Sequence, residues 1–236
     1  MHSLTHDHRE PGRVSTYKTQ GHVINWGWRY DLMLWFFNTF TAPGKWQALQ
    51  QTIIDLAQFQ SGEAVLDVGC GTGTLALIAK ERVGTAGRVC GIDPGPKQIT
   101  RARHKALRAG LSIDFQVGAI EQLPFPDQSF DIILSTLMMH VLPDDLKSRG
   151  LAEIARVLKP GGRVLIVDTR RPDEQSSERT QQGRPTRPVH TGPWNSGIQD
   201  QPQLLKEASF SQIESGELAT GETKLPEIGF VRARKI

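Results

Sequence analysis

Short apolar runs alternate with amphipathic stretches along the chain from residue 64 onward. The runs "AVLDV", "RVCGID", "IDFQV", "FDIILS" and "RVLIVD" have the length and the side chains of buried strands. Apolar residues recur at helical spacing over 74–82, 96–109 and 144–158, between successive runs. Five β-α units in this order predict a parallel sheet with helices on both faces.

The segments on either side of this core have their own patterns. Residues 30–40 and 45–59 are predicted as two helices, which "APG" separates and which form an N-terminal helical lid. At the other end, a short helix in 201–210 precedes "SQIESGEL" and "IGFVRARKI", two strands of a C-terminal antiparallel hairpin. The predicted fold class is therefore α/β, a Rossmann-like, mostly parallel seven-stranded sheet.

The domain organisation follows from these segments. We expect a flexible N-terminal segment over 1–25 and one domain over 26–236. Within that domain we expect the following parts: the lid at 26–60, a cofactor-binding core at 64–168, a flexible insert or flap at 170–200, and the closing helix and hairpin at 201–236. The flap is predicted because its sequence is rich in Arg, Pro, Gly, Ser and Gln and nearly free of aliphatic residues.

Composition and charge narrow the possible partners. The net charge is +3 and the pI is near 9.0, but the basic residues are scattered, which favours a solvated surface over a nucleic-acid site. Cys70 and Cys90 offer neither a disulfide framework nor metal-ligand spacing, so we expect a reducing, cytoplasmic setting and no metal. The sequence contains no apolar stretch long enough to predict a membrane span, and its polar first residues do not resemble a signal peptide.

The turn in "LDVGCGTGTLAL" has glycine at every second position, at Gly69, Gly71 and Gly73. Such a turn, between a strand and a helix, lets a ligand approach bare backbone at a helix N-terminus. The dinucleotide spacing G-x-G-x-x-G fails because Thr74 stands at its last position. Asp93 ends the next strand, where a carboxylate can accept both hydroxyl hydrogens of a ribose. The turn therefore predicts a cofactor with a ribose and no required pyrophosphate, although Asp93 could instead cap a helix.

Four motifs in order resemble one family. "LDVGCGTGTLAL", "GIDPGPKQITRAR", "LPFPDQSFDIILS" and "LKPGGRVLIVD" are similar to those of class I S-adenosylmethionine-dependent methyltransferases, in the branch of ubiquinone/menaquinone C-methyltransferases. The resemblance covers about 28–168 and implies S-adenosyl-L-methionine as the cofactor and methyl transfer as the activity. It also implies a set of cofactor-binding residues: Tyr30, Asp67, Gly69, Cys70, Gly71, Gly73, Asp93, Pro94, Ala119, Ile120, Ser135 and Thr136.

The resemblance gives these residues different roles. The turn would hold the methionine part of the cofactor, Asp67 its amino group and Asp93 the ribose hydroxyls. Ala119 and Ile120 would flank the adenine. Ser135 and Thr136 would line the mouth of the site after the fourth strand. Many relatives have an acid at the position of Ala119, so the contact to the adenine amino group is in question. Tyr30 resembles a tyrosine that closes over the cofactor, although a buried aromatic residue of the lid would look the same in sequence.

The chemistry of methyl transfer leaves the protein to orient two reactants and to exclude water. A base is optional, and His140 in "STLMMHVLPDD" is the candidate, because its loop borders the reacting methyl group in this architecture. The alternative is a histidine that only packs or caps the following helix.

"STLMMH" lacks the Asn/Asp-Pro-Pro-aromatic element of nucleobase amino methylases, so a small organic acceptor is favoured. An RNA or protein methyltransferase using the Arg-rich segment 170–187, or a non-catalytic cofactor-binding protein, remains the alternative.

Overall fold

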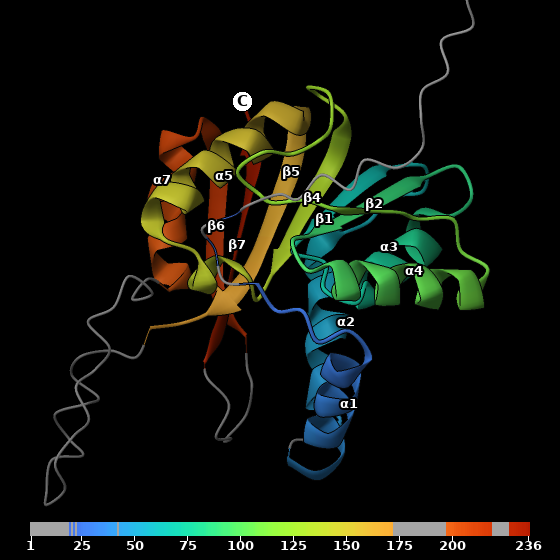
Figure 1. Cartoon of the computed structure of the whole chain (residues 1–236). Helices are drawn as coiled ribbons and strands as arrows, with labels where there is room; N and C mark the ends of the chain where they lie inside the picture. The colour runs from blue at the N-terminus through green and yellow to red at the C-terminus, as the bar shows by residue number, and fades with distance from the viewer. Residues whose placement is uncertain (1–18, 20, 22, 42, 172–196, 219–226) are drawn as a thin grey trace, which may run out of the picture.

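A single seven-stranded sheet organises the protein (Figure 1). The computed structural model describes residues 19, 21, 23–41, 43–171, 197–218 and 227–236. The strand order is β3-β2-β1-β4-β5-β7-β6, with only β7 antiparallel to its neighbours. The strands are β1 (Ala64–Val68), β2 (Arg88–Asp93), β3 (Asp114–Val117), β4 (Phe130–Thr136), β5 (Leu158–Thr169), β6 (Phe210–Leu218) and β7 (Ile228–Lys235). The predicted fold class, including the C-terminal antiparallel pair, is confirmed.

Helices follow most strands, as the apolar periodicity predicts. They are α1 (Trp28–Phe36), α2 (Lys45–Ala57), α3 (Thr74–Val83), α4 (Pro96–Ala109), α5 (Asp144–Val157) and α7 (Gln201–Glu207). Shorter helical turns are η1 (Phe37–Thr41, a π-helical turn that directly continues α1), η2 (Met139–Val141) and η3 (Ile198–Asp200). Pro96 begins α4 and Gly110, at a φ of 66°, ends it, so both boundary residues act as the sequence predicts.

The core has two layers because strand residues alternate between the faces of the sheet. On one face, Leu66 and its counterparts in neighbouring strands pack against Leu151 and Ile154 of α5. On the other face, Val65 packs with residues of α2, α3 and α4, such as Ile53 and Ile99. The helices therefore cover both faces of the sheet, and its carboxyl edge stays free for a ligand site.

The motif "KPGG" differs from its expected role. The sequence predicts that it ends the helix and that the next strand begins at Arg163, but β5 already begins at Leu158, which pairs with Phe130. The register then shifts, and Ile132 pairs with Arg163. Gly161 lies in this irregular stretch with a φ of 71°, a conformation that glycine adopts without strain. The motif is thus a bulge within the strand.

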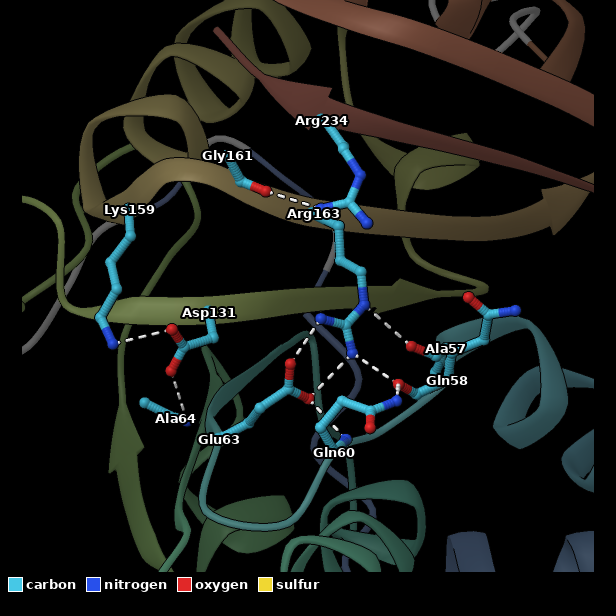
Figure 2. Close-up of polar contacts among 10 residues, drawn as sticks. All are labelled: Ala57, Gln58, Gln60, Glu63, Ala64, Asp131, Lys159, Gly161, Arg163 and Arg234. Carbon is cyan, nitrogen blue, oxygen red and sulfur yellow. Dashed lines mark hydrogen bonds and ion pairs between the residues drawn. The ribbon is translucent and has the colours of Figure 1, made fainter.

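Polar contacts fix the opposite, amino end of the sheet (Figure 2). Asp131 accepts hydrogen bonds from the backbone N–H of Ala64 (2.8 Å) and from Lys159 Nζ (2.8 Å). Arg163 forms a two-pronged ion pair with Glu63, at 2.6 and 2.8 Å. These contacts join the ends of β1, β4 and β5 far from the edge where the glycine turn lies.

Several predictions concern residues outside the described part of the chain. They include most of the predicted N-terminal segment and, in the predicted flap, residues 172–196. At the ends of that flap, η3 and Arg171 are described, and Gln199 Nε2 donates to the carbonyl of Arg171 (2.8 Å). Across the described ranges, no helix has the length and apolar character required to span a bilayer. The same residues contain no cluster of three or more His, Cys, Asp or Glu side chains arranged to hold a metal ion.

Candidate functional site

A cavity lies at the carboxyl edge of the sheet, where β1, β2 and β4 end at the same level. The register pairs Val68 with both Ile92 and Ser135, so the turns after these three strands converge. Nine of the predicted site residues line this one cavity: Tyr30, Asp67, Gly69, Cys70, Gly71, Asp93, Pro94, Thr136 and His140. Positions that span more than a hundred residues of sequence thus meet at the edge where α/β sheets bind ligands.

The three glycines of the turn have positive φ angles but different surroundings. A Cβ at Gly71 would meet no atom within 4 Å, so its bare backbone faces the open cavity. A Cβ at Gly69 would lie 2.6 Å from Cγ of Met138, and one at Gly73 would lie 2.7 Å from the ring of Phe115. Gly71 is therefore the position where a ligand can approach the backbone, whereas Gly73 is required for packing and lies outside the cavity lining.

Asp93 is held at the rim of the turn by two backbone donors. Its Oδ2 accepts from the N–H of Gly71 (3.0 Å) and its Oδ1 from the N–H of Gly95 (2.8 Å). Burial raises the pKa of Asp93 to about 6, and the two N–H donors act in the opposite direction. Each oxygen retains a free lone pair that can accept a hydroxyl hydrogen of a ligand.

Asp67 is almost completely buried below the turn, at the end of β1. Burial and the nearby charge of Asp93 raise the pKa of Asp67 to about 7, while the backbone N–H of Ala76 lowers it. Burial disfavours the ionised form of both acids, so a ligand that brings hydrogen-bond donors or positive charge would stabilise them.

Helix α1 brings Tyr30 to the mouth of the cavity. The helix is anchored by Asp31, whose two oxygens accept hydrogen bonds from Arg101 Nε and from Thr72 Oγ1, both at 2.6 Å. Burial, followed by the charges of Asp93 and Asp31, raises the pKa of Tyr30, so its hydroxyl stays protonated and can donate. The sequence did not identify Asp31, because a single acid on a short helix gives no indication of its partner.

A second hollow adjoins the cavity and shares Gly69, Pro94, Met138 and Val141 with it. Ala119 and Ile120 line this hollow. Glu121 lines it too, and its Oε2 is buried without a hydrogen-bond partner among the described residues. An orphaned carboxylate oxygen is costly unless something binds it. Glu121 thus places an acid two residues after Ala119, a shift in position that the motif resemblance at residue 119 does not indicate.

Ser135 and Thr136, the last two residues of β4, point to opposite faces of the sheet, as neighbours on a strand do. Thr136 lines the cavity, whereas Ser135 is buried beside β1 and does not. The chain then turns sharply at Leu137, whose φ of 52° is unusual for a branched residue. This turn places Met138 against the glycine loop and His140 at the cavity.

His140 is paired with Asp168 at the end of β5. Its Nδ1 lies 2.6 Å from Oδ1 of Asp168, and its backbone N–H donates to Oδ2 (2.9 Å). The backbone N–H of Thr169 also donates to this carboxylate (2.7 Å). The buried Asp168 therefore fixes the ring with Nδ1 as the donor, and Nε2 is free to accept a proton. The sequence analysis singled out His140 but treated Asp168 only as the end of a strand.

The sheet, the glycine turn and the buried acids define the protein as a Rossmann-like α/β protein with a cofactor site at the carboxyl edge of its sheet. Comparison with known proteins gives the class within that fold. Residues 65–162 match a family model described as a methyltransferase domain. The predicted resemblance to class I S-adenosylmethionine-dependent methyltransferases is confirmed as a resemblance.

Individual relatives agree with this class. A demethylmenaquinone methyltransferase of Symbiobacterium thermophilum is 35% identical over 146 residues, which are 61% of this chain and 55% of that protein. The chain thus spans about half the length of the curated relative it matches. The solved structure of an S-adenosylmethionine-dependent methyltransferase of Methanosarcina mazei is 26% identical, with a TM-score of 0.59, and the match covers 78% of this chain and 97% of that one.

A third similar structure is the [4+2]-cyclase SpnF, 21% identical with a TM-score of 0.63, covering 80% of each chain. At that identity only the fold is shared. The cyclase also shows that this fold hosts more than one chemistry, so the activity must be argued from the site.

Proposed function

We propose that the protein transfers a methyl group from S-adenosyl-L-methionine to a small, apolar organic acceptor. The observation that carries this proposal is one cavity that joins the open backbone at Gly71, the acids Asp67 and Asp93, and a histidine fixed by a buried carboxylate. The family match and the relatives support the class of reaction.

The residues present fit this cofactor. Gly71 offers bare backbone, and Asp93 offers two acceptor oxygens for ribose hydroxyls. Asp67 would meet the amino group of the methionine part. Glu121, with its orphaned Oε2, would accept from the adenine amino group in the adjoining hollow. When bound, the cofactor supplies an electrophilic methyl group on a sulfonium with a good leaving group.

The chain's own contribution to the reaction is to position the acceptor and to take a proton. Asp168 keeps the Nδ1–H of His140 in place, so Nε2 can accept the proton of an acceptor hydroxyl, thiol or acidic carbon. A bound cofactor would supply the methyl group, and Nε2 of His140 would take the proton that the acceptor gives up. Tyr30 and α1 cover the mouth and help to exclude water.

The walls beside His140 favour an apolar acceptor. Aliphatic and thioether side chains make up part of the cavity lining, those of Ile24, Leu34, Leu75, Leu137, Met138 and Val141. Among the described residues this lining contains no Lys or Arg side chain that would pair with an anionic acceptor. Because a 35%-identical relative is named as a demethylmenaquinone methyltransferase, a reduced quinone with an apolar side chain is the first acceptor to test.

Transfer of tritium from methyl-labelled S-adenosylmethionine tests the proposal. We expect label in the organic-extractable fraction when the enzyme receives demethylmenaquinol or an apolar extract of cells, and no label in RNA or protein. Label in RNA or protein instead would support the alternative acceptors. Tight cofactor binding without transfer to any fraction would indicate a non-catalytic protein.

A further inference from the structure

Helix α1 has no buried residue, although it is one of the most apolar helices in the protein. Trp28, Leu32, Trp35 and Phe36 are each more than half exposed and lie at positions i, i+4, i+7 and i+8. At helical spacing these four side chains form one face, here called the apolar stripe. Phe40 in η1 extends it, with its ring 4.9 Å from that of Phe36.

The opposite face of α1 already has a role. Tyr30 and Leu34 on that face line the cavity. Asp31 lies beside the stripe, one turn from Trp28 and from Trp35, and anchors the helix to the glycine turn and to α4. A helix that only closed a cavity would carry polar residues on its outer face. The apolar stripe is instead a contiguous exposed patch of large side chains, which marks a binding surface.

Basic side chains lie next to this patch. Helix α4 carries no acidic residue, and Lys97, His104 and Arg108 are exposed along it. A hollow between α4 and residues 25–29 brings Lys97 and His104 to the same depression as Trp26 and Trp28. The guanidinium of Arg29 lies 5.8 Å from the ring centre of Trp28. Asp31, the one acid of α1, is neutralised by Arg101.

Aromatic and aliphatic side chains flanked by Lys, Arg and His form the pattern of a helix that lies in a bilayer interface. Tryptophan is favoured there because its ring is apolar while its N–H can hydrogen-bond to water. Basic groups interact with anionic headgroups. We propose that the apolar stripe and the basic side of α4 dock this protein on an anionic phospholipid bilayer.

Docking in this way would place the cavity at the membrane surface. Figure 1 shows α1 and η1 projecting beyond the sheet, at the end of the molecule away from the C-terminus. Because α1 also forms the mouth of the cavity, an apolar acceptor dissolved in the bilayer could enter along it. The entry of an acceptor from the bilayer rests on the proposed function, whereas the docking itself does not.

Sedimentation with vesicles tests the docking without any methyl transfer. We expect the wild type to bind vesicles of phosphatidylcholine mixed with phosphatidylglycerol, to bind pure phosphatidylcholine less, and to be released by high salt. Leu32→Glu should weaken binding by at least about tenfold, because a carboxylate at the interface opposes insertion. The matched control is Ile236→Glu, which adds the same charge at another exposed apolar residue, at the C-terminus, and should bind as the wild type does.

Three results would overturn the docking proposal: no binding of the wild type to either vesicle, equal binding of Leu32→Glu and wild type, or self-association that Leu32→Glu abolishes while lipid binding is absent. The last would assign the stripe to a second copy of the chain. Trp35→Ala, checked for native circular dichroism, guards against misfolding of the charged variant. Calorimetry with S-adenosylhomocysteine on the same samples reports cofactor binding separately, so failure of docking and failure of the proposed function are distinguishable.

Discussion

Four acidic residues lie near the cavity at the carboxyl edge of the sheet, and their different surroundings suit them to different roles. Asp67 is deeply buried, and burial raises its pKa to about 7. Asp93 has a pKa of about 6 and already accepts two backbone N–H groups. Glu121 has an oxygen without a partner, and Asp168 is fully engaged with His140 and its neighbours. Contacts to ligand are therefore expected from the first three, and orientation of a base from the fourth.

Glu121→Gln tests the adenine contact. The glutamine amide can donate where the carboxylate can only accept, so the preference between ligands should change. We expect the wild type to bind S-adenosylhomocysteine more tightly than S-inosylhomocysteine, and the variant to reduce that ratio by about tenfold. Calorimetry with both ligands gives the ratio. An unchanged ratio in a folded variant would show that Glu121 does not face the adenine.

Two variants separate the roles of His140 and Asp168. If Nε2 is the base, His140→Ala should reduce kcat by about a hundredfold or more, with cofactor affinity within a few-fold of wild type. Asp168→Asn should reduce kcat less, by about tenfold, and change the pH profile of kcat, because the ring loses its fixed tautomer. Near-normal turnover by folded His140→Ala would leave proximity as the main source of catalysis.

At the scale of elements, Arg163 connects β5 to the end of α2 (Figure 2). Besides its ion pair with Glu63, it donates to the carbonyls of Ala57 (3.0 Å) and Gln58 (2.8 Å). Both members of the ion pair are largely buried, at 18% and 13% side-chain exposure. This one side chain thus ties the end of α2 to the sheet, in addition to the buried packing of Ile53 and Ala57.

Arg163→Ala should lower the free energy of unfolding by about 2–4 kcal/mol, because it leaves the largely buried carboxylate of Glu63 without its cation and the carbonyl of Ala57 without this donor. The exposed Arg234 is the control, since it donates only to the carbonyl of Gly161, and Arg234→Ala should cost less than about 1 kcal/mol. Urea unfolding gives both values. Equal, small losses would mean that water replaces Arg163 without cost.

Elements with strong local patterns could be predicted from the sequence, and contacts between distant elements could not. The run "AVLDV" and the glycine turn predicted β1 and the start of α3, because a buried strand requires apolar residues and a positive φ favours glycine. The bulge within β5 was missed, since a Pro-Gly-Gly run resembles a loop until its pairing with Phe130 is known. The partnership of His140 with Asp168 spans 28 residues and depends on the left-handed turn at Leu137, which no local pattern indicates.

For the whole molecule, the two raised pKa values make stability depend on pH. A carboxyl with a raised pKa in the folded state binds its proton more tightly there than in the unfolded chain, where its pKa is about 4. Its contribution is therefore present below about pH 4 and is lost as the pH rises to about 7. Asp67→Asn stays neutral, so its unfolding free energy relative to wild type should increase between pH 5 and pH 8, by at least about 1 kcal/mol. A difference independent of pH would contradict the burial of Asp67.

The central claim is that the turn at Gly71 holds S-adenosylmethionine, and calorimetry with S-adenosylhomocysteine tests it most directly. Gly71→Val and Gly110→Val are matched, because both glycines have positive φ and open space at Cβ, but only Gly71 lines the cavity. We predict that the wild type and Gly110→Val bind the ligand and that Gly71→Val loses at least about a hundredfold in affinity. Equal affinity of the two variants, or no binding by the wild type, would contradict the account.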